Sequence, residues 1–318
     1  MKRLQKNYRI LDFTIFVTTN SRDLIEILDE NFLYPEARPL PAIRGWFSLE
    51  VDVVSNLEHV RGLVDEFHYS YDHTQDALLL SYLDGAIRVE ISYPNRKITA
   101  RVEKIALHYR AALGNWLLTI PFAELVKEYK FYFMHSAALE KDNRTLLLAG
   151  KSGRGKTTLA LALLKMGWRY ISDDEIYLYE EQGFWARGGP IRAKVTCKTW
   201  EMFQDILGEP ERYRGKRLID LEAAFPDKVL ERGKVATLCI IKPEETFRIE
   251  KLKSIEAVKE LFSLAFLNSH PDYTRENFEF LANFCYSIPC YRLNFTTDFE
   301  ELDRWLTEII RVNSGALK

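Results

Sequence analysis

The sequence predicts an α/β fold in which a strand-rich α+β domain precedes a domain built around a phosphate-binding loop (P-loop). In residues 146–158, an apolar strand runs into a glycine-rich turn and then into a helix. The first third of the chain is rich in strand patterns, whereas strands and helices alternate after residue 235. We therefore expect an accessory or recognition domain over 1–113 and a P-loop catalytic domain over 114–318.

The glycine-rich stretch 150–157 matches the motif G-x-x-x-x-G-K-[ST] in full. Glycines let successive backbone N–H groups turn toward phosphate oxygens, Lys156 would reach the β- and γ-phosphates, and Thr157 would hold Mg²⁺. The motif requires a strand before it and a helix after it, and the patterns over 145–149 and up to Gly167 provide both. The expected cofactors are therefore ATP and Mg²⁺. The predicted nucleotide-binding residues are Gly150, Lys151, Ser152, Gly153, Arg154, Gly155, Lys156, Thr157 and Thr158.

Composition and charge limit the class of protein. A chain of 318 residues with 47% hydrophobic and 28% charged residues is globular and long enough for two domains. A net charge of −2 gives no general attraction to nucleic acid or to anionic membranes. The four cysteines form no C-x-x-C pair, the first residues lack the apolar core of a signal peptide, and no apolar run has the length of a membrane span. We expect a soluble cytoplasmic protein with neither nucleic acid nor membrane as a partner.

The first third of the chain contains no motif whose chemistry can be named. Its strand patterns cover 10–18, 46–54, 67–71, 77–83, 86–92 and 97–102, with a hairpin turn at Asp84-Gly85. Its helix pattern covers 23–32, and a mostly helical segment over 104–129, interrupted near Gly114 and Pro121, is expected to join the two domains. The spacing of His59, His68 and His73 fits no metal signature, so these side chains are interpreted as solvated or packed. The region is interpreted as a recognition domain.

Residues 131–140 have the composition of a buried strand and end in a polar turn at 141–144. This strand is expected to pair antiparallel with the strand of the motif. His135 would then lie near the phosphate end of the sheet if the register places it there. A hydrogen-bonded core histidine is the alternative.

A strand pattern over 168–172 ends in the acids Asp173, Asp174 and Glu175. Ligands of open α/β sheets gather at the carboxyl ends of strands, so acids at this position are natural Mg²⁺ ligands or bases. Two adjacent acids can divide the roles, since one carboxylate can take the proton of an attacking hydroxyl while its neighbour holds the metal. A turn or helix-capping acid pair is the alternative.

The residues after the acids contain two basic clusters and complete the second domain. Arg187, Arg192, Lys194 and Lys198 form one cluster and residues 212–217 the other. Either could bring positive charge to a transferring phosphoryl group, and a solvated loop is the alternative. The last helix is expected to begin with a capping box at Thr297 and Glu300.

The series of His135, the loop 150–157 and the run 167–174 resembles, in order and spacing, the catalytic domain of HPr serine kinase/phosphorylase and its relatives, themselves similar to phosphoenolpyruvate carboxykinases. The resemblance covers 131–179. It implies that the loop binds the phosphates of ATP and that Thr157 is a Mg²⁺ ligand. It also implies that Asp174 is the catalytic base, Asp173 the metal-side acid and His135 a modulator of the site. The residues alone leave open which acid is the base.

One segment departs from this family. Where the family has a glutamate-arginine-glycine segment associated with phosphorolysis, this chain reads Ala186-Arg187-Gly188. The first third also shows no counterpart of the family's regulatory domain. The resemblance therefore does not extend to phosphorolysis, to HPr as substrate or to the family's hexamer. It points to divergent kinase relatives, some of which are found with peptide-tailoring systems.

The sequence predicts an ATP-dependent kinase that transfers the γ-phosphoryl group to a serine or threonine hydroxyl of a peptide or small protein. One alternative is a P-loop ATPase with Asp174 and Glu175 as a Walker-B-like pair, although 170–172 is a poor version of the apolar run expected there. A nucleotide-sensing module of a peptide-maturation system and a small-molecule kinase are the others. The sequence leaves a homo-oligomer open.

Overall fold

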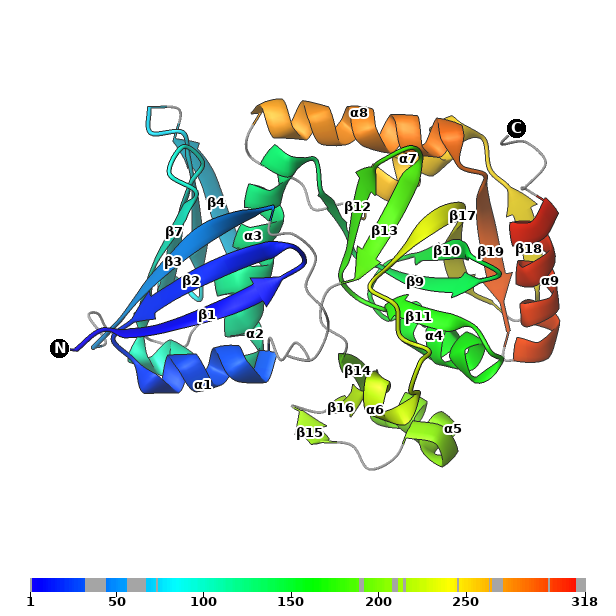
Figure 1. The fold of residues 1–318 in the computed structure, drawn as a ribbon, viewed down its shortest axis with the longest axis horizontal. Helices are drawn as coiled ribbons and strands as arrows, with labels where there is room; N and C mark the ends of the chain where they lie inside the picture. Colours follow the sequence, from blue (N-terminus) through cyan, green and yellow to red (C-terminus); the bar gives the residue numbers. More distant parts are fainter. Residues whose placement is uncertain are drawn as a thin grey trace. The chain divides into compact units, whose positions relative to one another are not determined.

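The structure is a computed structural model with a mixed α/β fold (Figure 1). It describes residues 2–31, 44–55, 67–72, 74–188, 192–207, 211–213, 216–244, 246–262, 264, 271–296 and 298–312. The chain divides into two compact units, one comprising Met1–Tyr129 with Asn268–Thr274 and the other Lys130–Leu267 with Arg275–Lys318. The α/β class predicted from the sequence is confirmed.

A seven-stranded sheet forms the frame of the first unit, in the order β1-β2-β3-β7-β6-β5-β4. Its strands are β1 Leu4–Ile10, β2 Phe13–Thr19, β3 Gly45–Val54, β4 Phe67–Asp72, β5 Ala77–Tyr82, β6 Ile87–Ser92 and β7 Lys97–Glu103. The strand predicted over 10–18 is present as β2 and begins at Phe13, whereas β1 was not predicted. The chain turns between the two strands at Leu11, whose φ of 55° lies in the left-handed region. The remaining predicted strands of this region are confirmed, including the hairpin at Asp84-Gly85.

Helices cover one face of this sheet. They are α1 Arg22–Asn31, the 3₁₀ helix η1 Lys104–His108, α2 Arg110–Gly114, the π-helix η2 Asn115–Thr119, α3 Ile120–Leu125 and the 3₁₀ helix η3 Val126–Tyr129. The rings of Phe122 and Tyr129 pack on Phe13, with centroids 5.8 and 4.8 Å away. These contacts place the helical segment up to Tyr129 in the first unit, whereas the sequence places the domain boundary at 113/114.

The core of the first unit contains a buried ion pair. The Lys127 ammonium lies 2.7 Å from the Glu124 carboxylate, and the two side chains are 1% and 0% exposed. The Tyr93 hydroxyl donates to the second oxygen of Glu124 at 3.3 Å. Burial lowers the pKa of Lys127, and the Glu124 carboxylate opposes that shift. Each charge therefore depends on the other, since neither has access to water.

Lys127→Met is expected to lower the free energy of unfolding by about 3–5 kcal/mol, because it leaves the Glu124 charge buried without its partner. The double variant Lys127→Met/Glu124→Leu should recover most of this loss, since it removes both charges. Urea unfolding of the intact chain measures both values. Lys97→Met is the control, because Lys97 and Glu50 form a half-exposed pair. Equal losses in the single and double variants would contradict the prediction.

Two sets of strands that share the long strand β17 form the main sheet of the second unit. One set runs β11-β9-β10-β17-β19-β18, and the other runs β8-β12-β13-β17. The strands are β8 Tyr132–Met134, β9 Ser136–Lys141, β10 Arg144–Ala149, β11 Arg169–Ser172, β12 Ile176–Glu180, β13 Phe184–Gly188, β17 Arg232–Pro243, β18 Arg248–Lys251 and β19 Cys290–Phe295. A separate three-stranded sheet contains β14 Arg192–Thr196, β15 Glu211–Tyr213 and β16 Lys216–Asp220.

The predicted antiparallel pairing of 131–140 with the motif strand is confirmed, with Ser136 opposite Ala149. The prediction of one continuous strand was wrong. The chain breaks at His135, so β9 pairs with β10 while β8 pairs with β12 in the other set. The break places His135 at the start of β9, on the edge of the sheet where β10 ends.

Helices pack on both faces of this sheet (Figure 1). Their bounds are α4 Lys156–Lys165, α5 Cys197–Leu207, α6 Leu221–Ala224, α7 Ser254–Phe262, α8 Pro271–Ser287 and α9 Phe299–Val312. Alternate residues of β10 enter two cores, with Leu146 and Leu148 facing α4 and α9, and Leu147 and Ala149 facing α7 and α8. Within the described part of the chain, no helix combines the length and apolar composition needed to cross a membrane.

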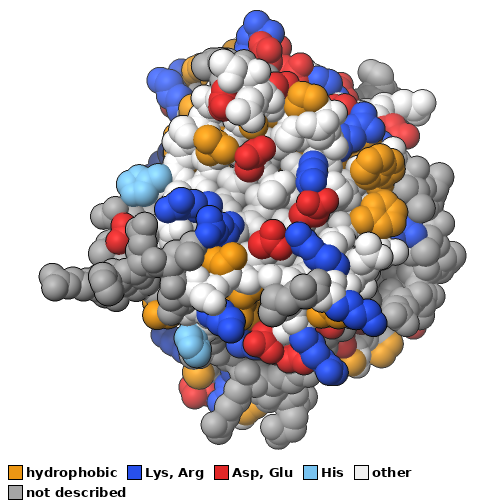
Figure 2. All heavy atoms as spheres, turned by 90° about the vertical axis from the view of Figure 1, so that its left-hand side faces the viewer, with side chains coloured by type: hydrophobic (Ala, Val, Ile, Leu, Met, Phe, Trp, Pro, Cys, Tyr) orange, Lys and Arg blue, Asp and Glu red, His pale blue; other side chains and the backbone are white. Residues whose placement is uncertain are grey.

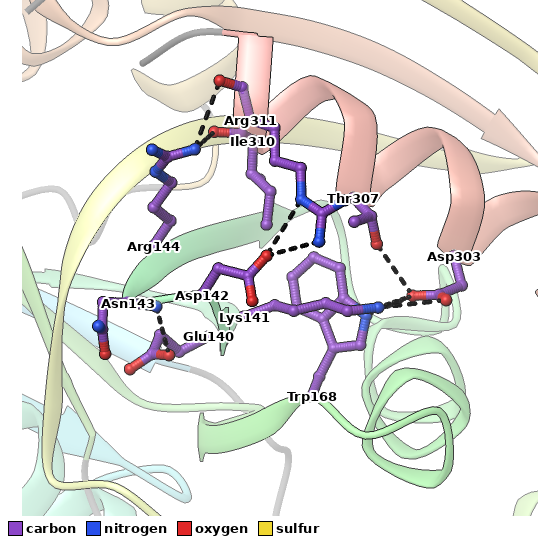
Figure 3. A network of polar contacts seen from close by, with 10 residues as sticks. All are labelled: Glu140, Lys141, Asp142, Asn143, Arg144, Trp168, Asp303, Thr307, Ile310 and Arg311. Carbon is purple, nitrogen blue, oxygen red and sulfur yellow. Dashed lines mark hydrogen bonds and ion pairs between the residues drawn. The ribbon is translucent and has the colours of Figure 1, made fainter.

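A polar network ties α9 to the β9–β10 hairpin (Figure 3). Asp303 accepts hydrogen bonds from Lys141 at 2.9 Å and from the Trp168 indole at 2.5 Å. At the other end of the helix, Arg144 donates to the Ile310 carbonyl at 3.1 Å, and Arg311 pairs with Asp142 at 2.8 Å. The hairpin that leads into the glycine-rich loop is therefore held by a helix from the far end of the chain.

The N-cap of α9 is Asp298, whose carboxylate accepts from the Glu301 N–H at 3.0 Å. The predicted capping box at Thr297 and Glu300 is one residue earlier, and Thr297 lies outside the described residues.

Candidate functional site

The predicted strand, glycine-rich loop and helix are present as β10, residues 150–155 and α4. Gly155 has a φ of 85°, and a Cβ on it would lie 3.1 Å from the Phe295 ring, so the close approach and the left-handed backbone both favour glycine. The helix ends at Lys165, and Gly167, with φ 91°, closes it in a Schellman arrangement in which the Trp168 N–H donates to the Leu163 carbonyl. The motif thus has the structural context that phosphate binding requires.

Lys156 is the first residue of α4, and its side chain folds back over the loop. The ammonium donates to the Gly150 carbonyl at 2.6 Å and to the Lys151 carbonyl at 3.4 Å. Burial lowers the pKa of Lys156, and the carboxylates of Asp174 and Asp173 oppose that shift. The lysine therefore lies within the electrostatic reach of both predicted acids.

The glycine-rich loop and the acids lie on one edge of the sheet because of its topology. β10, β17 and β19 are parallel, while β9 is antiparallel to both β10 and β11. The carboxyl ends of β10 and β11 consequently point the same way, with Ser172 at the end of β11 opposite Ala138. Asp173 and Asp174 follow directly. This edge is the position where open α/β sheets bind ligands.

Asp173 is buried beside the loop. The Tyr170 hydroxyl donates to its carboxylate at 2.6 Å, and the Thr157 hydroxyl also donates to it. Burial raises the pKa of Asp173, the Asp174 charge raises it further, and these two hydrogen bonds oppose the shift. The carboxylate that neighbours Thr157 is thus the buried one of the pair.

Asp174 has a different environment, because 48% of its side chain is exposed. Its carboxylate lies 2.9 Å from His135 Nδ1, and the same nitrogen is 3.2 Å from its backbone carbonyl. Burial raises the pKa of Asp174, but His135, Lys194 and Lys156 together bring it below its ordinary value. The two neighbouring acids therefore have pKa values moved in opposite directions, which is how adjacent carboxyl groups take different roles.

The structure brings His135, Lys156, Thr157, Asp173 and Asp174 to one edge of one sheet. Among the other predicted loop residues, Lys151, Ser152, Gly153 and Arg154 are exposed. The Thr158 hydroxyl lies 3.0 Å from the Thr199 hydroxyl of α5, so the Thr158 side chain is hydrogen-bonded within the protein.

Two residues near the acids are absent from the predicted set. Tyr170 is fully buried and hydrogen-bonds Asp173, and Lys194 of β14 lowers the pKa of both acids. The basic cluster contained Lys194, but no sequence pattern separates it from its neighbours. In the same cluster, Arg187 pairs with Glu231 at 3.7 Å and Lys198 is exposed. In the second cluster, Arg217 stacks on the Trp200 ring at 4.3 Å.

The edge of the sheet at which Asp173 and Asp174 lie suits a cation that is bound by both a carboxylate and a phosphate. Within the described residues, no group of three or more His, Cys, Asp or Glu side chains could hold a metal ion. Mg²⁺ is usually bound through one or two carboxylates together with substrate phosphates and water. Asp173 beside Thr157 fits such a site, since a carboxylate and a hydroxyl oxygen lie next to the loop.

Comparison with known proteins adds little to this geometry. No family model and no curated protein matches the chain. Among solved structures, the chain is similar to the Hpr(Ser) kinase/phosphatase from Coxiella burnetii, with 16% sequence identity and a TM-score of 0.31, over 56% of this chain and 93% of that chain. This kinase-like neighbour is too distant to carry an argument, so the interpretation of the site rests on its residues.

Proposed function

We propose that the chain is an ATP-dependent kinase that transfers the γ-phosphoryl group to a serine or threonine hydroxyl of a peptide or small protein. The observation that carries this proposal is the meeting of the loop 150–157, the buried Asp173 and the partly exposed pair of Asp174 and His135 on one edge of the sheet. Phosphoryl transfer needs these parts, namely a phosphate cradle, a cation site and a base.

Each residue has a role in this reaction. The loop backbone and Lys156 hold the phosphates, and Thr157 with Asp173 would hold Mg²⁺, which neutralises charge on the β- and γ-phosphates. Asp174 accepts the proton of the acceptor hydroxyl while the hydroxyl oxygen forms a bond to the γ-phosphorus. The bond between the γ-phosphorus and the bridging oxygen of the β-phosphate breaks, which releases ADP. His135 Nδ1 keeps the Asp174 carboxylate in place.

The exposure of Asp174 favours transfer to an acceptor. A base that receives a proton from a hydroxyl must lie within hydrogen-bond reach of it, so a substrate must be able to approach. Asp174 is 48% exposed, whereas Asp173 is buried. We therefore assign the base to Asp174 and the metal side to Asp173.

We propose that a peptide acceptor docks on the open face of the first unit's sheet (Figure 2). A groove of about 740 Å³ lies there, over β3, β4, β5, β6 and β7. Arg88 of β6 stands directly opposite Arg101 of β7, and neither has an ion-pair or hydrogen-bond partner among the described residues. The groove also contains Glu90 and Asp52, and Asp52 stands opposite Arg101 on its other side, so Arg88 is the position at which an acidic residue of a bound peptide would relieve most repulsion. Leu79 and Tyr69 provide apolar contact in the same groove.

The charge-reversed variant Arg88→Glu/Arg101→Glu is expected to reduce phosphorylation of an acidic peptide acceptor about tenfold or more, because it replaces attraction by repulsion. ATP turnover without acceptor should not change. Arg22→Glu/Lys104→Glu is the control, since it makes the same change of net charge at exposed positions outside the groove. Equal loss in both variants would assign the effect to net charge and contradict a docking role for the groove.

The acceptor is identified by incubating the protein with γ-labelled ATP and candidate peptides, especially any short precursor encoded nearby, and mapping the label by mass spectrometry. Label on a serine or threonine hydroxyl is the expected result. A labelled small molecule without peptide label would overturn the peptide acceptor. Phosphate release at the same rate with and without acceptor would replace the kinase by an ATPase.

A further inference from the structure

A second cavity, of about 250 Å³, lies beside the glycine-rich loop. Lys151 and Arg154 of the loop line one side. Ile240 and Ile241 at the carboxyl end of β17 line another, with Glu260 of α7 and Arg292 of β19. The roles given to the loop, the acids and His135 do not use this cavity.

The order of the strands places the cavity opposite the acids. β11, which leads to Asp173 and Asp174, lies on one side of β10, and β17 and β19 lie on the other. In a nucleotide whose γ-phosphate faces the acids, the remaining phosphates follow the loop away from the acids and end at the nucleoside. The nucleoside therefore reaches the side of β17 and β19, where the cavity opens.

The lining has the chemistry that a nucleoside needs. Ile241 is a buried side chain beside Gly150 at the cavity and offers apolar contact to a base. The Arg154 side chain is exposed and has no ion-pair or hydrogen-bond partner among the described residues, so its planar guanidinium is available to stack on a base. Glu260 offers a carboxylate, and carboxylates accept the hydrogen bonds of ribose hydroxyls in nucleotide-binding folds.

Arg292 keeps the Glu260 carboxylate at the cavity. Its guanidinium contacts Glu260 and lies 3.6 Å from Glu250 of β18. The interaction with Glu260 raises the pKa of Arg292, so the guanidinium stays charged beside this carboxylate. A carboxylate accepts more than one hydrogen bond, so one that arginine holds in place can also accept from a hydroxyl group.

We infer that this cavity holds the nucleoside of the nucleotide, with Glu260 accepting hydrogen bonds from the ribose hydroxyls and Arg154 covering the base. The inference rests on the proposed function, since it takes the phosphates to lie in the loop 150–157. It explains why the loop carries an arginine at a position where the motif accepts any residue. It also makes the protein selective for ribonucleotides over polyphosphates and deoxy analogues.

The test compares three ligands by calorimetry with the intact chain in Mg²⁺, namely ATP, 2′,3′-dideoxy-ATP and inorganic tripolyphosphate. The wild-type protein should bind ATP about tenfold or more tightly than dideoxy-ATP, as expected for hydrogen bonds to a charged group. Glu260→Gln should bring this ratio close to one and leave tripolyphosphate affinity within about twofold of the wild-type value. Glu256→Gln, on the exposed side of the same helix, is the control and should keep the wild-type ratio.

The outcomes separate this inference from the proposed function. Equal binding of ATP and dideoxy-ATP by the wild-type protein overturns the ribose contact and needs no variant. An unchanged ratio in Glu260→Gln, with ATP and tripolyphosphate still bound, overturns the assignment of Glu260 and leaves the kinase proposal intact. Absence of binding by both ATP and tripolyphosphate overturns the nucleotide site itself.

Discussion

Lys156→Ala is expected to reduce phosphoryl transfer by about 10³-fold or more while the fold stays intact. The motif provides the Lys156 ammonium as the cation for the β- and γ-phosphates. Removing a preorganised charge at a transferring phosphoryl group lowers the rate by about this factor. Its protein partners are the carbonyls of Gly150 and Lys151, so its removal breaks no ion pair of the core. Transfer is measured with labelled ATP, and circular dichroism with thermal unfolding monitors the fold.

Lys165→Ala is the matched control for this experiment. Lys165 ends the same helix, and its pair with Asp205 joins two exposed side chains. Transfer and stability should therefore stay close to the wild-type values. Undiminished transfer in Lys156→Ala would remove the phosphate-binding assignment of the loop.

Asp174→Asn is expected to keep ATP affinity and to lower transfer by about two orders of magnitude or more, as for the loss of a positioned base. The amide keeps the size of the carboxylate and its oxygen can still accept a hydrogen bond from His135, so the local geometry is retained. Single-turnover transfer and calorimetric ATP binding, both in saturating Mg²⁺, separate the two effects.

Asp173→Asn provides the contrast. Because Asp173 lies beside Thr157, this change should raise the Mg²⁺ concentration needed for half-maximal transfer more than it lowers the rate at saturating Mg²⁺. If Asp174→Asn instead raises the Mg²⁺ requirement and Asp173→Asn lowers the saturated rate, the roles of the two acids are exchanged.

The parts of the site that could be predicted from sequence are local. The glycine-rich loop lies between β10 and α4 because an apolar strand, a turn and a helix follow each other within 146–165. The acids follow β11 for the same reason, since the apolar run and its end are adjacent in sequence. Patterns of this kind depend on neighbouring residues, so one sequence suffices to find them.

The parts that could not be predicted depend on distant residues. Residues 131–140 have the composition of a buried strand throughout, so nothing local indicates that the strand breaks at His135 and changes partner. Most side chains of β1 are polar, so the strand shows no apolar pattern and is defined only by its pairing with β2. The pairing of Tyr170 with Asp173 depends on a bend after β11, and the position of Lys194 depends on the three-stranded sheet. The domain boundary depends on which sheet the segment 114–129 packs against.

The network between α9 and the β9–β10 hairpin bears on how the protein is made. Lys141 and Asp303 are 162 residues apart in sequence, and Asp142 and Arg311 are 169 apart. At a synthesis rate of about 5–20 residues per second, roughly ten to thirty seconds separate the emergence of the hairpin from that of its helix. During this interval the strand before the glycine-rich loop lacks the helix that covers its core face, and an exposed apolar strand is a site of aggregation. We expect nascent chains that stop before α9 to engage chaperones, and the proposed nucleotide site to form only after α9 has left the ribosome.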